Sequence, residues 1–267
     1  MTLVKVGEIE LDCERAGSGP PLLLIMGLSG TALHWGEPFL DALRPDFEVI
    51  VYDHRGVGAS SPLTGNLTIG ELAEDAAGLL DALEIESTHV LGISMGGMVA
   101  QELTLACPER LRTLTLGCTS CGGALGLHPA PEVTQGLAEG MISGSRERAI
   151  RAAWEVNVSP RFAADPDAWA RFLEIGLRRP VAIPVIMEQM RAILGHDTCA
   201  RLPTITPPTL VIHGTLDRML PVQNGGLIAE LIPGSGLEIL EGIGHLFFWE
   251  EPERSAELVR AHAAVHA

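Results

Sequence analysis

The chain alternates between short, continuously apolar runs and longer amphipathic segments. Four of the runs contain almost no polar side chain, which is typical of strands buried on both faces of a sheet. They span residues 22–26, 49–52, 89–93 and 209–212. Parallel sheets covered by helices bury their strands in this way. The first residues differ, because the run 2–6 and the alternating segment 9–13 predict an antiparallel hairpin with one face in water.

Amphipathic segments between these runs predict helices. The clearest spans residues 68–84, where Thr68 and Glu71 form a capping-box pair that satisfies free N–H groups at the helix start. Residues 95–106 predict a second helix, which ends before Pro108. Residues 252–262 predict a third, whose first turn suits Pro252. Strands that alternate with helices predict an α/β fold with a mostly parallel sheet.

The alternation is interrupted between residues 120 and 200. No buried strand is recognisable there, and prolines separate four helical segments. These segments span residues 131–142, 145–156, 166–177 and 181–194. We therefore predict a core formed by residues 1–119 and 201–267, and a helical insertion at 120–200 that follows a strand at 111–116.

Composition and charge exclude several classes of protein. The 267 residues carry a net charge of −16, and Lys5 is the single lysine. Nucleic-acid grooves need clustered lysines and arginines, and anionic membrane surfaces repel such a chain. The N-terminus lacks the basic segment and long apolar run of a signal peptide, and the run 22–26 is too short to cross a bilayer. We expect a cytoplasmic protein, monomeric or homo-oligomeric, that acts on a small molecule.

The five cysteines predict neither a disulfide framework nor a metal site. Their number is odd and the chain is long, so we expect reduced thiols. Cys118 and Cys121 form a C-x-x-C pair, but no second pair completes a zinc site, and the pair does not open a thioredoxin-like helix. No P-loop or dinucleotide-binding glycine motif follows the first parallel strand. We therefore expect neither a metal nor an organic cofactor.

Residues 92–96 read Gly-Ile-Ser-Met-Gly, a G-x-S-x-G sequence between an apolar strand and an apolar helix. A nucleophile elbow requires this context, because the tight turn leaves room only for glycine on either side of the serine. The turn presents the Ser94 hydroxyl at the start of the next helix, where developing negative charge is favoured. An ordinary glycine-rich turn is the alternative, but the flanking elements favour Ser94 as a nucleophile.

A serine nucleophile needs a base at neutral pH, and His245 is the strongest of nine candidates. It follows the last predicted strand, 237–240, in a loop bracketed by glycine. His262 and His266 fall in the terminal helix or tail and are poorer candidates. Three histidines near strand ends or in loops remain alternatives: His34, His54 and His213.

The base must be held in one tautomer by a buried carboxylate. Asp217 follows the strand at residues 209–213 in the segment Gly214-Thr215-Leu216-Asp217. A surface turn is the alternative for this aspartate. The order Ser94, Asp217, His245 along the chain favours the triad.

At this point the chain resembles the α/β-hydrolase superfamily, in its branch of small serine esterases and lactonases. Residues 52–60 resemble the family's D-x-R-G-x-G-x-S segment, and Gly244-His245 with Glu251-Pro252 resembles its C-terminal histidine motif. The stretch from residue 52 to 120 is similar to 3-oxoadipate enol-lactonases. Met26-Gly27 and residues 52–55 are similar to methylesterases that act on polyketides.

The resemblance implies an oxyanion hole and a cap. The backbone N–H groups of Leu28 and Met95 would stabilise the oxyanion, although Met26 stands where the family usually has histidine. The insertion would be a cap over the site. Expected pocket residues are Trp154 and Met187 from the cap, and Leu220 and Leu246 beside the acid and base.

The leading interpretation is a carboxylic-ester hydrolase that forms an acyl-enzyme on Ser94 and accepts small or medium acyl groups. A lactonase of the enol-lactonase type and a cofactor-free perhydrolase are alternatives with the same triad. Dehalogenases and epoxide hydrolases of this fold place aspartate at the nucleophile, so Ser94 argues against both. A non-catalytic small-molecule receptor is a further alternative, although such receptors usually have a damaged triad and all three positions are filled here.

Overall fold

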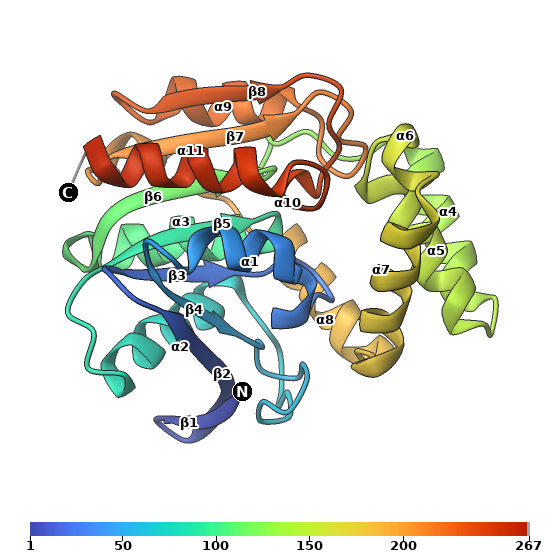
Figure 1. Cartoon of the computed structure of the whole chain (residues 1–267), viewed down its shortest axis with the longest axis horizontal. Coiled ribbons are helices and arrows are strands. Elements are labelled where there is room, and N and C mark those ends of the chain that lie inside the picture. The colour runs from blue at the N-terminus through green and yellow to red at the C-terminus, as the bar shows by residue number, and fades with distance from the viewer. Residues whose placement is uncertain (266–267) are drawn as a thin grey trace.

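The computed structural model describes residues 1–265, so His266 lies outside the described residues. An eight-stranded sheet in the order β1-β2-β4-β3-β5-β6-β7-β8 forms its centre (Figure 1). The first two strands are an antiparallel hairpin and β2 pairs antiparallel with β4, whereas all further pairs are parallel. The predicted fold class and hairpin are therefore confirmed. The strands are β1 (Thr2–Val6), β2 (Ile9–Gly17), β3 (Pro21–Ile25), β4 (Glu48–Tyr52), β5 (Thr88–Ile93), β6 (Leu111–Gly117), β7 (Thr209–Gly214) and β8 (Gly236–Leu240).

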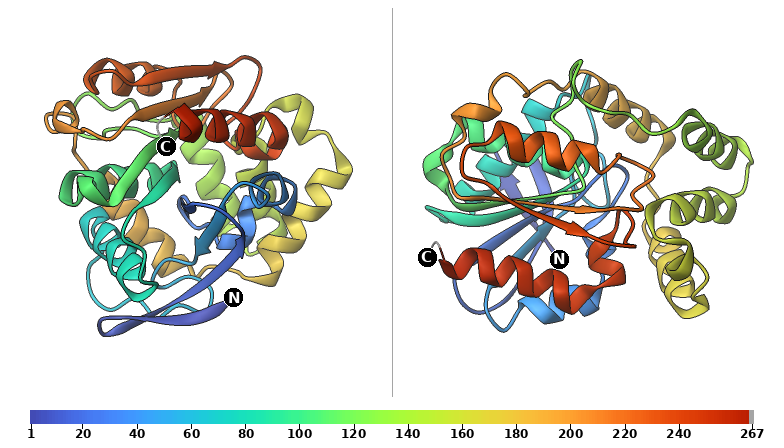
Figure 2. Two further views of the ribbon diagram at one scale, coloured as in Figure 1. Left: turned by 60° about the vertical axis from the view of Figure 1, so that its left-hand side comes forward. Right: turned by 90° about the horizontal axis from the view of Figure 1, so that it is seen from above.

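Helices cover both faces of the sheet (Figures 1 and 2). Two hydrophobic clusters fill the space between the layers, one on each face. One face carries α2 (Ile69–Ala82), α3 (Met95–Ala106) and α9 (Gln223–Leu231), and the other carries α1 (Glu37–Leu43), α10 (Phe247–Glu250) and α11 (Pro252–Val265). The short 3₁₀ segments are η1 (Ala32–Trp35), η2 (Pro108–Arg110) and η3 (Leu202–Thr204).

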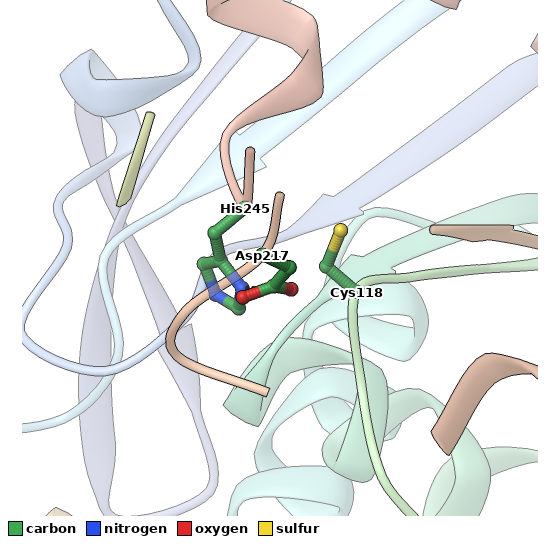
Figure 3. Close-up of side chains that lie close together, drawn as sticks. All are labelled: Cys118, Asp217 and His245. Atoms are coloured by element: carbon green, nitrogen blue, oxygen red, sulfur yellow. Dashed lines mark hydrogen bonds and ion pairs between the residues drawn. The ribbon is translucent and has the colours of Figure 1, made fainter. Parts of the chain in front are cut away.

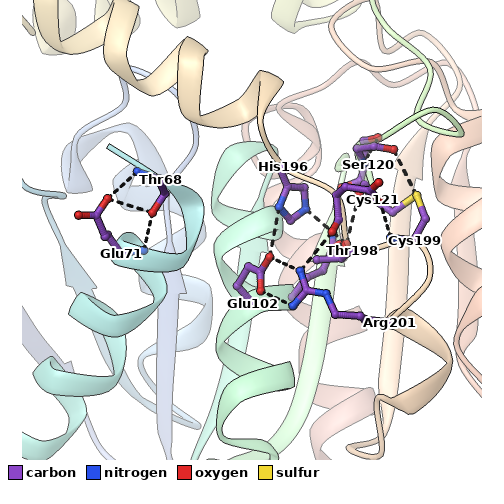
Figure 4. Close-up of polar contacts among 12 residues, drawn as sticks. Thr68, Glu71, Glu102, Ser120, Cys121, His196, Thr198, Cys199 and Arg201 are labelled. Carbon is purple, nitrogen blue, oxygen red and sulfur yellow. Dashed lines mark hydrogen bonds and ion pairs between the residues drawn. A yellow bond between two sulfur atoms is a disulfide. The ribbon is translucent and has the colours of Figure 1, made fainter. Parts of the chain in front are cut away.

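The predicted capping box at the start of α2 is present. The Glu71 backbone N–H donates to the Thr68 hydroxyl, and the Thr68 backbone N–H donates to the Glu71 carboxylate at 2.8 Å (Figure 4). These bonds satisfy free N–H groups at the helix start. The stripe of buried residues on α2, including Leu72, Ala76 and Leu79, then packs the helix onto the sheet.

The predicted helical insertion lies between β6 and β7, beside the carboxyl ends of the central strands (Figure 1). Four of its helices match the predicted segments within two residues, and a single turn, α6, was not predicted. The helices are α4 (Pro131–Ile142), α5 (Arg146–Asn157), α6 (Pro160–Ala163), α7 (Pro166–Arg178) and α8 (Ile183–Leu194). Figure 2 shows the group to one side of the sheet and its covering helices.

The prediction that every cysteine is a reduced thiol is wrong. Cys121 and Cys199 form a disulfide, with Cα atoms 5.0 Å apart across 78 residues (Figure 4). The bridge joins the two ends of the insertion, where Gly122 and Asp197 also form an antiparallel β-bridge. The number and spacing of the cysteines could not show this pairing, because the fold alone brings the two ends of the insertion together. Cys118 is free, so the two cysteines of the C-x-x-C pair are not joined to each other.

Polar contacts fix the insertion near this bridge. The Arg201 guanidinium pairs with the Glu102 carboxylate on α3, and the Thr198 hydroxyl donates to the Gln101 side chain (Figure 4). His196 lies buried with Nδ1 3.7 Å from Glu102.

None of the helices in the described part of the chain combines the length and apolar character of a membrane span.

Candidate active site

Ser94 lies in a strained turn between β5 and α3. Its φ of 57° and ψ of −122° place it in a region that residues other than glycine rarely adopt. A Cβ atom at Gly96 would lie 2.0 Å from the Ile25 carbonyl oxygen, and one at Gly92 would lie 2.2 Å from the Gly96 carbonyl oxygen. The two glycines are therefore required by close backbone contacts, and the turn has the geometry that the sequence predicts for a nucleophile elbow.

Asp217 lies directly after β7 and is surrounded by donors. The Met219 and Leu220 backbone N–H groups donate to its Oδ1 at 2.8 and 2.9 Å, and Oδ2 lies 2.7 Å from His245 Nδ1. Burial opposes the charged carboxylate, but the His245 ring and a second histidine, His213, hold the pKa of Asp217 well below its usual range. The carboxylate therefore remains ionised at neutral pH.

Two histidines contact Asp217, and their surroundings separate their roles. His245 faces the carboxylate with Nδ1, which leaves Nε2 available for another partner. His213 Nε2 lies 3.2 Å from Asp217 Oδ2 and 2.9 Å from the Leu220 carbonyl oxygen. Both are acceptors, so His213 must carry its proton on Nε2. Its Nδ1 faces Gly225, where an added Cβ atom would lie only 2.8 Å from this nitrogen.

Glu250 holds the loop that carries His245. Its Oε1 accepts from the backbone N–H groups of Gly244 and Ser159, both at 2.8 Å, and its Oε2 accepts from the Ser159 hydroxyl. The Leu246 N–H donates to the Asn157 carbonyl oxygen at 2.8 Å. Sequence reasoning missed Glu250 because one of its partners, Ser159, lies 91 residues away on the insertion and the other, Gly244, is bound only through its backbone N–H. It lies next to the Glu251-Pro252 motif, which was the only available signal.

The ends of neighbouring strands bring Ser94 near the acid and base. The Ser94 N–H donates to the Gly117 carbonyl oxygen at 2.9 Å. Cys118, the next residue, lies beside Asp217 and His245, with the three side-chain ligand atoms within 4.8 Å of one another (Figure 3). Asp217 and His245 are hydrogen-bonded, whereas no hydrogen bond in the described part of the chain joins the Ser94 hydroxyl to His245.

Cys118, Asp217 and His245 also form the single group of potential metal ligands found among the described residues. His245 Nδ1 and Asp217 Oδ2 already face each other at hydrogen-bond distance, which occupies the atoms that a metal would need. Burial and the Asp217 carboxylate raise the pKa of the Cys118 thiol well above its usual range, so the sulfur stays protonated. An acid–base pair with a neutral thiol explains the group better than a metal centre.

The loop after β3 runs against Ser94. A Cβ atom at Gly27 would lie 3.1 Å from the Ser94 Cβ, so the loop passes closer to Ser94 than a side chain ordinarily allows. His54 Nε2 lies 3.0 Å from the Met26 carbonyl oxygen, and the Ala32 N–H donates to Asp53 Oδ1 at 2.6 Å. These contacts fix the loop despite the replacement of the usual histidine by Met26. The segment resembling D-x-R-G-x-G-x-S supplies both partners.

Each of the two expected oxyanion donors directly follows one of the two residues in this contact. Leu28 follows Gly27 in the loop after β3, and Met95 is the first residue of α3. An N–H in the first turn of a helix has no partner within the helix, so the Met95 N–H can serve a ligand.

The four expected pocket residues occupy different surroundings. Trp154 is fully buried among the rings of Phe162, Phe172, Trp169 and Trp249, so it belongs to the packing of the insertion against α10. Met187 is 52% exposed on α8. Leu246 is buried beside His245, and Leu220 adjoins the Asp217 carboxylate through its N–H.

Comparisons with known proteins identify the family of this chain. The model of a family described as the α/β-hydrolase fold matches residues 20–252. The chain is 32% identical over 259 residues to a protein of Azorhizobium caulinodans provisionally named carbamate hydrolase RutD, covering 95% of this chain and 94% of the relative. It is 31% identical to a pimeloyl-[acyl-carrier protein] methyl ester esterase of Aeromonas hydrophila, covering 94% and 98%.

Solved structures extend the similarity to the whole fold. A hydrolase from Pseudomonas aeruginosa PA01 superimposes with a TM-score of 0.85 at 30% sequence identity, covering 98% of this chain and 97% of that one. The family match spans most of the sheet and the whole insertion, and both curated relatives are hydrolases. This chain therefore belongs to the α/β-hydrolase family and is a hydrolase.

Proposed function

We propose that the protein is a serine hydrolase that cleaves carboxylic esters of small or medium acyl groups through an acyl-enzyme on Ser94. The observation that carries the proposal is the strained turn at Ser94, bonded to Gly117, whose neighbour Cys118 lies beside the buried, hydrogen-bonded Asp217–His245 pair. Similarity to a methyl ester esterase supports ester bonds as the target. Leu220 and Leu246 adjoin the acid and the base, and they would offer an apolar wall to the acyl group.

In the proposed mechanism, the Ser94 hydroxyl attacks the ester carbonyl carbon while His245 Nε2 takes its proton. The N–H groups of Leu28 and Met95 stabilise the oxyanion that forms. His245 then gives the proton to the departing alcohol, which leaves an acyl group on Ser94. Water, deprotonated by His245, attacks this acyl group and releases the acid and the free serine. Asp217 holds the His245 ring in position and stabilises its charged form.

The test compares initial hydrolysis rates of p-nitrophenyl acetate, butyrate, octanoate and palmitate for the wild type and Ser94→Ala. We expect the shorter esters to be cleaved faster than palmitate. The variant should lose ~10⁴–10⁶ in kcat, because the nucleophile and base act as a unit. A fluorophosphonate probe, analysed by mass spectrometry of peptides, should label the wild type at Ser94 and leave Ser94→Ala unlabelled.

The two readouts separate the mechanism from the substrate. Ester cleavage that survives in Ser94→Ala would contradict the role of Ser94. Labelling without turnover of any of the four esters would retain the serine hydrolase and reject simple esters as substrates.

Carbamate hydrolysis is the second candidate, because the relative from Azorhizobium caulinodans carries that name. The same triad would form a carbamoyl-enzyme on Ser94. Two further compounds decide between ester, carbamate and lactone hydrolysis. p-Nitrophenyl N-methylcarbamate tests carbamate cleavage and γ-butyrolactone tests lactone cleavage, both measured beside the esters. The ester proposal requires the highest kcat/KM for an ester, and a higher value for either other compound would overturn it.

A further inference from the structure

Gln189 is an unusual residue on the inner face of α8. Its neighbours one turn away on this face are Val185 and Ala192, whereas Met187 and Met190 face outward and are exposed. The Gln189 side chain is fully buried. A carboxamide in such a position disfavours folding unless its oxygen and nitrogen both find hydrogen-bond partners.

One end of the Gln189 carboxamide is bound to the loop after β3. The Ser29 backbone N–H donates to Oε1 at 2.9 Å. Because an N–H must face an acceptor, this contact identifies the oxygen of the carboxamide and directs Nε2 to the other side. Ser29 adopts a positive φ of 56° and follows Leu28, whose N–H is a proposed oxyanion donor.

The other end of the carboxamide has no protein partner. Gln189 Nε2 is buried and forms no hydrogen bond within the described part of the chain. Other buried polar atoms without partners include Trp35 Nε1 and Tyr52 Oη, and both of these rings lie in the hydrophobic clusters. Unlike these two, Gln189 is bonded to the loop that runs against Ser94. His54 contacts the same loop, but its unpaired Nδ1 is an acceptor, because its Nε2 donates to the Met26 carbonyl oxygen. The carboxamide with this free donor is therefore bonded to the residue that follows Leu28, a proposed oxyanion donor.

The chemistry of Nε2 restricts its partner. The nitrogen donates two hydrogens and accepts none, so the partner must be an oxygen acceptor. An anionic partner would need a compensating cation. The arginines with contacts near this part of the chain are occupied: Arg191 pairs with Glu188, and Arg179 pairs with Asp12 and Asp53. A neutral ether, hydroxyl or ketone oxygen meets both conditions.

We propose that Gln189 is a substrate-binding residue, whose Nε2 donates to a neutral oxygen that the substrate carries close to its ester group. The preferred substrates are then esters with an alkoxy, hydroxy or oxo group in the acyl or alcohol part. This inference rests on the proposed ester hydrolysis and names the substrate class of the same site. A plain alkanoic ester would leave the buried donor unpaired, which a site built around a hydrogen bond discriminates against.

The experiment uses pairs of esters that differ only by exchange of a methylene group for an ether oxygen. The acyl pairs are p-nitrophenyl butyrate with methoxyacetate, and p-nitrophenyl valerate with 3-methoxypropionate. The alcohol pair is butyl acetate with 2-methoxyethyl acetate, followed by pH-stat. For each pair, the ratio of kcat/KM values is compared between the wild type and the variants, so that intrinsic ester reactivity cancels.

Two variants separate substrate binding from support of the loop. Gln189→Met removes both hydrogen bonds, whereas Gln189→Glu keeps an acceptor for the Ser29 N–H and removes the donor. We expect the ratio to fall roughly three- to tenfold in both variants for at least one pair, the effect of one neutral hydrogen bond. Gln135→Met, an exposed residue on α4, is the matched control and should keep the wild-type ratios.

Each other outcome overturns the inference. Unchanged ratios in both variants, with or without a uniform loss of rate, would mean that Nε2 serves no substituent. A ratio that falls in Gln189→Met and stays at the wild-type value in Gln189→Glu would mean that Gln189 only supports the loop. Failure of the proposed function is distinguishable, because it is measured by the Ser94→Ala variant and not by these ratios.

Discussion

At the scale of single residues, the Asp217 carboxylate is the most heavily constrained group of the site. Two backbone N–H groups bind one oxygen, and His245 and His213 approach the other. Such saturation fixes the carboxylate in one orientation and favours its charged form. Asp217 and His245 lie in the loops that follow β7 and β8, where the sequence analysis expected them. His213 was only an alternative in the sequence analysis. Its partners, Asp217 and the Leu220 carbonyl oxygen, are brought to it by the conformation of the loop at residues 217–220, which the sequence does not reveal.

We expect His213 to act on catalysis through Asp217 and not through the substrate. His213→Leu removes the Nε2–H donor and should lower kcat about tenfold at constant KM, which corresponds to one hydrogen bond to a charged group. His213→Gln keeps an N–H at a similar reach and should recover most of kcat. A change in KM with constant kcat, or equal loss in both variants, would contradict this role. Steady-state kinetics on p-nitrophenyl butyrate provides the measurement.

At the scale of elements, the sequence was informative wherever an element is long and periodic. The parallel strands and four insertion helices were predicted because each has a clear apolar pattern. The helices α1, α9 and α10 were missed: α1 and α10 are short, and two glycines at 225–226 weaken the helical signal of α9. The Cys121–Cys199 bridge was missed because it depends on how the insertion ends meet in space.

The disulfide should contribute strongly to stability because it closes a long loop. Replacing Cys121 and Cys199 together by serine should lower the free energy of unfolding by about 4 kcal/mol, from the lost restriction of the unfolded chain. Cys107→Ser, at a partly buried free thiol, is the control and should have a small effect. Urea unfolding provides the measurement.

Thiol counting checks the bridge independently. Alkylation of the denatured, unreduced protein should modify three of the five cysteines, and prior reduction should expose all five. Five modified thiols without reduction would contradict the bridge.

At the scale of the whole molecule, buried histidines make stability depend on pH. Burial lowers the pKa of His89 to about 4, with further lowering by the Arg112 charge. Burial also lowers the pKa of His196 to about 4, against the opposing effect of Glu102. Both side chains are nearly inaccessible to solvent. Between pH 6.5 and about 4, the unfolded chain therefore binds more protons at these positions than the folded one.

The free energy of unfolding should fall as the pH decreases from 6.5 to about 4. Above pH 6.5 these histidines are neutral in both the folded and the unfolded chain, so they do not affect the free energy of unfolding. Below it, each extra proton that the unfolded chain binds adds a slope of ~1.4 kcal/mol per pH unit. His89→Asn removes one such group and should reduce the slope by up to that amount. Urea unfolding midpoints at pH 7.5, 6.5, 5.5 and 4.5 provide the test. An unchanged slope in the variant would contradict the assignment of His89.

The junction at Cys121 and Cys199 makes the insertion an exchangeable module. The two Cα atoms lie 5.0 Å apart, so a replacement segment would need ends that meet at this spacing. Domain insertions succeed where the two ends of the inserted piece lie close together. Protein engineers could therefore graft insertions from other family members onto this sheet and vary selectivity in recombinant libraries. A graft would have to carry over residues 157–159, which contact the His245 loop, and would have to replace the insertion's contacts with Ser29 and Trp249.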